Sequence, residues 1–74
     1  MDYSTLSTMP PDVTRYGDML ELTWPALGFW ASVEVGPGPR VGQYSGGDPR
    51  AVVEPAVLAA AAAHGHVLVQ PPAS

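Results

Sequence analysis

The two histidines of the chain, His64 and His66, lie one residue apart. Imidazole groups bind zinc and transfer protons near neutral pH, so this spacing raises the question of a metal or acid–base site. The alanine run 59–63 and Gly65 instead predict that a helix ends here, with His64 in its last turn. No Asp or Glu is spaced to complete a metal site, so we expect a structural role. Metal binding, acid–base chemistry and a pH-sensitive contact remain the alternatives.

The glycine-rich stretch 42–49, GQYSGGDP, superficially suggests a phosphate-binding loop. It lacks the lysine and the glycine spacing of a P-loop. Ser45 also lacks the GxSxG pattern of a nucleophile elbow. We therefore interpret this stretch as a loop that leads into a capped helical turn.

The carboxylates form no close pair with a catalytic spacing. Glu21 and Glu34 are expected on the same outer face of a hairpin, where two like charges are most simply solvated. A glycosidase-type acid pair would need a cleft, for which a short chain has little room. We predict no catalytic residue, no cofactor and no metal site, and hence no enzyme.

Three aromatic residues cluster around one turn: Trp24, Phe29 and Trp30. Alternation assigns Trp24 and Phe29 to the core and Trp30 to the opposite face. Trp30 is then either covered by another part of the chain or exposed as an interface anchor. A base-stacking platform would need a basic groove, which this sequence does not supply.

Alternating apolar and polar residues predict the strands that position these side chains. Met19–Trp24 and 29–35 alternate and form an antiparallel hairpin, and Arg40–Tyr44 is a third short strand. Two helix starts compete, at Pro49 and at Pro55. A proline inside a helix removes a hydrogen bond, so we favour a main helix over 55–64, although Pro55 could instead kink a longer one.

The predicted fold is a small α+β domain. Residues 1–17 have no helical or strand period and contain two adjacent prolines, so an extended N-terminal arm is expected there. We expect a neighbouring subunit to hold this arm, and the alternative is that it packs on its own domain. The domain then spans 18–70 and ends with a strand over 66–70. Residues 71–74 form a C-terminal tail.

Composition limits the partners of this chain. It has 74 residues, no cysteine, no lysine and a net charge of −4. The charge disfavours nucleic acid and anionic membranes, since both are bound by clustered basic side chains. No apolar run approaches the roughly 20 residues of a membrane span, and the N-terminus does not resemble a signal peptide.

The core is small and has no disulfide, and only 14% of the residues are charged, which favours a chain completed by neighbouring subunits. We therefore predict a building block of a larger assembly, bound through its arm and apolar surface to other subunits, including copies of itself. The candidate interface residues are Tyr3, Leu6, Met9, Leu27, Trp30 and Tyr44.

The absence of lysine, asparagine and isoleucine indicates a GC-rich genome. Together with the arm, the hairpin and the alanine helix, this composition resembles that of small virion proteins of actinobacterial tailed phages. These are minor tail, connector or capsid-decorating subunits. The resemblance implies a non-catalytic structural protein located in the virion. The alternative is a small cytoplasmic adaptor, antitoxin or inhibitor that binds one protein partner.

Overall fold

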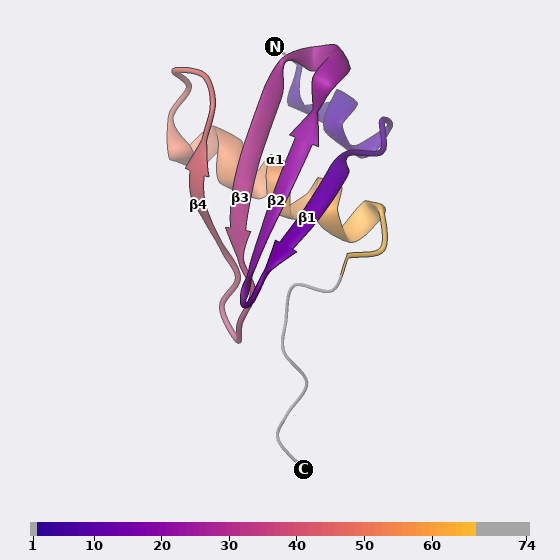
Figure 1. The fold of residues 1–74 in the computed structure, drawn as a ribbon. Helices are drawn as coiled ribbons and strands as arrows, with labels where there is room; N and C mark the ends of the chain where they lie inside the picture. The colour runs from indigo at the N-terminus through magenta and orange to yellow at the C-terminus, as the bar shows by residue number, and fades with distance from the viewer. Residues whose placement is uncertain (1, 67–74) are drawn as a thin grey trace.

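Alternating residues build a four-stranded antiparallel sheet in the computed structural model, which describes residues 2–66. The strands follow one another in the order β1-β2-β3-β4, with one helix behind them (Figure 1). The elements are η1 (Tyr3–Ser7), β1 (Asp12–Tyr16), β2 (Met19–Trp24), η2 (Pro25–Leu27), β3 (Phe29–Glu34), β4 (Arg40–Tyr44) and α1 (Arg50–Ala63). The α+β class is confirmed, as are the hairpin of β2 and β3 and the third short strand.

The core lies between α1 and one face of the sheet, called here the inner face. The buried inner-face side chains are Leu20, Leu22, Trp24, Phe29, Ala31, Val33 and Val41. The helix adds Val53, Val57, Ala60 and Ala61, which repeat at the spacing of one helical face. Small alanines let the helix lie close to the sheet, and α1 crosses the whole sheet from β4 to β1 (Figure 1).

The helix start predicted at Pro55 is wrong, because α1 begins at Arg50 and continues through Pro55. Proline in a helix interior costs about 3 kcal/mol. Burial of Val53, which lies in the turn of α1 before Pro55, returns about 1.5–3 kcal/mol. Side-chain bonds from Arg50 and Glu54 to β4 add to this, so tertiary contacts override the local signal.

The extended arm expected over residues 1–17 is also corrected. Asp12–Tyr16 is strand β1, paired with β2, and Tyr3–Ser7 is a turn of 3-10 helix packed against α1. Leu6 is fully buried and the Trp24 indole donates a hydrogen bond to the Met9 carbonyl at 2.7 Å. The N-terminal segment therefore closes one end of its own core, because Leu6 buries apolar surface there.

The helix ends as the sequence predicts, at a glycine. Gly65 has a φ of +82°, and the backbone N–H groups of Gly65 and His66 donate to the carbonyls of Ala62 and Ala61 at 3.0 and 2.9 Å. This is the Schellman arrangement, which satisfies the last carbonyls of a helix. The strand predicted over 66–70 and the tail 71–74 lie outside the described residues.

Candidate functional site

Of the six predicted interface residues, only Trp30 is largely exposed. Its side chain stands on the face of the sheet opposite α1, called here the outer face, with 40% of its surface accessible. Leu6 is fully buried in its own core and cannot contact a neighbour. The remaining four are partly buried against that core: Tyr3, Met9, Leu27 and Tyr44.

The two histidines take different parts at the end of α1. The His64 Nε2 lies 2.9 Å from the Leu6 carbonyl oxygen, which ties the end of α1 to η1. His66 takes part in the helix end through its backbone N–H. Among residues 2–66, no group of three His, Asp or Glu side chains is placed to hold a metal ion.

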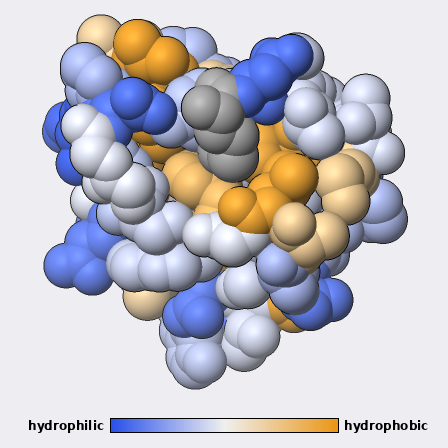
Figure 2. Space-filling model, turned by 90° about the horizontal axis from the view of Figure 1, so that it is seen from above, coloured by the Kyte–Doolittle hydropathy of each residue, from blue (hydrophilic) through white to orange (hydrophobic). Residues whose placement is uncertain are grey.

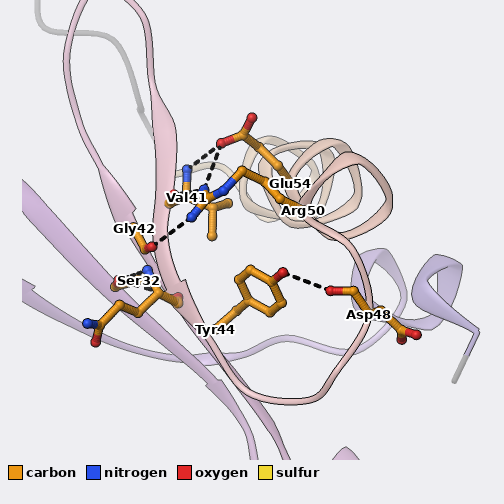
Figure 3. A network of polar contacts seen from close by, with 8 residues as sticks. Ser32, Val41, Gly42, Tyr44, Asp48, Arg50 and Glu54 are labelled. Carbon is orange, nitrogen blue, oxygen red and sulfur yellow. Dashed lines mark hydrogen bonds and ion pairs between the residues drawn. The ribbon is translucent and has the colours of Figure 1, made fainter.

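The loop from β4 to α1 is held by structural hydrogen bonds. The Tyr44 hydroxyl donates to the Asp48 carbonyl oxygen at 2.7 Å (Figure 3). The Tyr3 hydroxyl donates to the Asp48 carboxylate, and this bond raises the pKa of Tyr3 to about 12. In η1, hydrogen bonds from Ser4 lower the pKa of Asp2, the N-cap residue. The stretch is a loop that leads into a helix, as predicted, but the predicted cap is wrong, because Pro49 is the N-cap of α1 and no side chain within residues 2–66 caps its first turn.

Strand β4 lies at one edge of the sheet, and side chains of α1 bond to both the N–H and the carbonyl of its residue Val41 (Figure 3). The Glu54 carboxylate accepts from the Val41 N–H at 3.0 Å, and the Arg50 guanidinium donates to the Val41 and Gly42 carbonyls. Edge strands with free backbone groups are prone to pair with other chains. Within the described part of the chain β4 is thus protected, whereas β1 pairs only with β2.

The outer face carries a shallow groove of about 840 Å³. Trp30 forms one wall, and Ser32 and Gly42 form part of the floor. The other lining residues are Met19, Glu21, Thr23, Glu34 and Gln43. The groove exists because no element of the described chain covers this face, while α1 and η1 occupy the other side.

The floor of the groove is a β-bulge between β3 and β4. The register shifts between Ala31 and Val33, and the Ser32 hydroxyl accepts from the Gln43 N–H at 2.9 Å. A Cβ on Gly42 would stand 3.0 Å from the Ser32 Oγ, so glycine permits this close approach. Local sequence patterns do not predict this bulge, because it depends on the register between two strands.

The outer face is acidic as well as apolar. Glu21 stands opposite Ser32 and Glu34 opposite Met19, so the two carboxylates are diagonal neighbours across β2 and β3. Both side chains are exposed, and among the described residues no hydrogen bond or ion pair reaches either carboxylate. The expected placement of Glu21 and Glu34 on one outer face is confirmed.

Hydrophobic side chains also gather at the end of the sheet that carries η2 (Figure 2). Figure 2 looks down on the end that carries η2, where hydrophobic side chains (orange) gather near the centre between hydrophilic ones (blue). Trp30 is the second residue of β3 and so belongs to this end of the sheet, where the half-buried Leu27 ends η2.

No helix among residues 2–66 is long and apolar enough to cross a bilayer. Comparison of the chain with protein-family models, with curated proteins and with solved structures found no match. The candidate site is thus defined by its own geometry: an acidic sheet face that no element within residues 2–66 covers and on which Trp30 is exposed.

Proposed function

We propose that the protein is a non-catalytic structural subunit of a larger assembly, such as a tailed-phage virion, and that it binds neighbouring subunits through the outer face. The observation that carries the proposal is the unequal covering of the sheet. One face is sealed by α1 and η1, while the other exposes 40% of Trp30 above a groove. Exposed tryptophans beside a groove are frequent anchors of protein interfaces.

The composition supports the same proposal. Only 14% of the residues are charged, against about 25% in an average soluble domain. The chain also has no disulfide to compensate for a small core. A neighbour that covers the outer face would bury Trp30 and Met19, both of which are exposed large apolar side chains.

The experiment measures how many copies of the chain travel in its native complex. Particles and complexes are separated by size from the cells or lysates that produce the protein, and the chain is quantified in each fraction by mass spectrometry. We expect many copies in one large particle. A one-to-one complex with a single partner would favour an adaptor or inhibitor, and a free monomer would overturn both readings.

Two matched variants assign the contact to the outer face. Trp30→Ser removes the exposed ring and should lower incorporation into the particle. Val52→Ser removes an exposed apolar side chain from α1, where 52% of the residue is accessible, and should leave incorporation unchanged. Equal loss with both variants, or loss with neither, would contradict a contact made by the outer face.

A further inference from the structure

We infer that the groove on the outer face binds an arginine-bearing segment of a different protein, with the guanidinium group lying between the Trp30 ring and the carboxylates of Glu21 and Glu34. This inference rests on the proposed function, because it names the chemistry of the neighbouring subunit. It is carried by three features of the face: its shape, its charge and the absence of any cationic side chain from the described lining of the groove.

The shape suits a side chain rather than another sheet. The groove is bounded by the Trp30 ring and floored by Gly42, which has no side chain, and by the small Ser32. Its volume of about 840 Å³ exceeds that of one side chain, so a short peptide segment can enter. The lining strands β2 and β3 pair on both sides, so recognition must come from side chains rather than from free backbone groups.

The negative charge of the groove favours a cationic ligand. Diagonal neighbours across two strands lie roughly 7–8 Å apart at their Cα atoms, so one cationic group can reach both Glu21 and Glu34. Neither carboxylate has a partner among the described residues. Tryptophan is the best aromatic face for a cation, and a planar guanidinium can stack on it while it bonds to a carboxylate.

The described part of the chain does not fill the groove with its own cations. The Arg50 guanidinium is bonded to β4, and Arg15 donates to the Gly17 carbonyl oxygen at 3.0 Å. Arg40 stands opposite Glu34 in the ladder, yet no ion pair joins them. The chain contains no lysine.

A second copy is a poor occupant for the same reason. Face-to-face packing of two copies would place the carboxylates of Glu21 and Glu34 against their own duplicates. Like charges held together on a desolvated surface are destabilising. A basic segment from a different subunit instead neutralises the face and covers Trp30.

The test adds a short oligo-arginine peptide to the full chain. An oligo-glutamate peptide of equal length is the negative control. Binding is followed by NMR shifts of the Trp30 indole N–H. We expect oligo-arginine to move the Trp30 signal and to leave that of the buried Trp24 in place. Substitution of both Glu21→Gln and Glu34→Gln should weaken binding about tenfold, which corresponds to 1.4 kcal/mol.

Three further variants distinguish specific binding in the groove from non-specific attraction of the peptide by the net negative charge. Asp2→Asn with Asp48→Asn removes the same two charges away from the groove and should change affinity less than about twofold. Trp30→Leu should weaken binding several-fold. Arg40→Ala removes a competing cation beside Glu34 and should strengthen binding. Equal weakening by the two double variants would overturn the inference.

The failures of the two proposals are distinguishable. If Trp30→Ser blocks incorporation into the particle while the Glu21 and Glu34 variant assembles normally, the outer face is an interface but its occupant is not basic. If sedimentation shows dimers of the purified chain that Trp30→Ser abolishes, a second copy occupies the face and the inference is wrong. If no large particle contains the chain, the proposed function fails, whether or not the peptide binds.

Discussion

The Glu54 carboxylate of α1 accepts a hydrogen bond from the Val41 backbone N–H of β4 at 3.0 Å. This bond fills an outward-facing donor on the edge of the sheet. It also fixes the first turns of a helix that contains Pro55. The same carboxylate oxygen lies 3.4 Å from the Arg50 guanidinium (Figure 3). The Glu54 side chain therefore joins α1 to the edge strand β4 and also forms an ion pair within α1.

We therefore expect Glu54→Ala to lower the free energy of unfolding by about 1–2 kcal/mol, because the Val41 N–H loses its acceptor. Glu54→Gln keeps an amide oxygen and should lose less. Glu21→Ala, at an exposed carboxylate that has no partner within residues 2–66, is the matched control and should stay within about 0.5 kcal/mol. Urea unfolding followed by tryptophan fluorescence measures all three, and equal stability of the Glu54 and Glu21 variants would contradict the role of this bond.

A second prediction concerns the bulge beneath the groove. Gly42→Ala places a methyl group 3.0 Å from the Ser32 Oγ, which cannot turn away without losing its bond to the Gln43 N–H. Overpacking of this kind should cost about 1–2 kcal/mol. Gly36→Ala, where a Cβ meets open space, is the control.

The cause is isolated by a double-mutant cycle with Ser32→Ala. Removal of the hydroxyl makes room for the methyl group, so the cost of Gly42→Ala should shrink in the Ser32→Ala background. Strictly additive costs in thermal and urea unfolding would show that the two residues do not interact, and would place the penalty elsewhere in β4.

Local patterns were sufficient for the sheet interior and the helix end. Alternation locates β2 and β3, and Gly65 supplies the left-handed residue that ends α1. Alternation also places Trp30 outside and Trp24 inside, which defines the candidate face. These features depend on residues that are close in sequence, so local sequence patterns are enough to predict them.

Strand β1 and the start of α1 at Arg50 were not predicted from local sequence patterns. Strand β1 has one half-buried apolar residue, Val13, so its alternation is weak. The dipeptide Gly17-Asp18 was a usable signal, because a two-residue turn with a positive φ at glycine joins the hairpin of β1 and β2. By contrast, the continuation of α1 through Pro55 depends on contacts with β4, which no local window shows.

A third prediction follows from the bond between the Tyr3 hydroxyl and the Asp48 carboxylate, which raises the pKa of Tyr3 from 10.0 to about 12. The protonated phenol is the form that the fold stabilises. The contribution of this bond is therefore complete below pH 10 and is lost as the pH rises through about 12. Tyrosinate absorbance should show one of the three tyrosines titrating late.

The partner of Tyr3 can be changed without touching the phenol. Asp48→Asn removes the negative charge, so the late titration should move back toward the ordinary value. In Tyr3→Phe the late component should disappear, and stability should no longer fall between pH 10 and 12 from this source. An unchanged late titration in Asp48→Asn would assign the shift to another tyrosine.

The last prediction addresses the histidines. The carbonyl oxygen of Leu6 only accepts, so the His64 Nε2 at 2.9 Å must donate, and the bond joins residues at opposite ends of the described chain. His64→Ala should lower the free energy of unfolding by about 1 kcal/mol and speed amide exchange in η1. His66→Ala, whose ring makes no such bond within residues 2–66, should stay within about 0.5 kcal/mol. A shared metal or acid–base site would make the two substitutions equivalent and their combination non-additive, whereas a structural tie affects His64 alone.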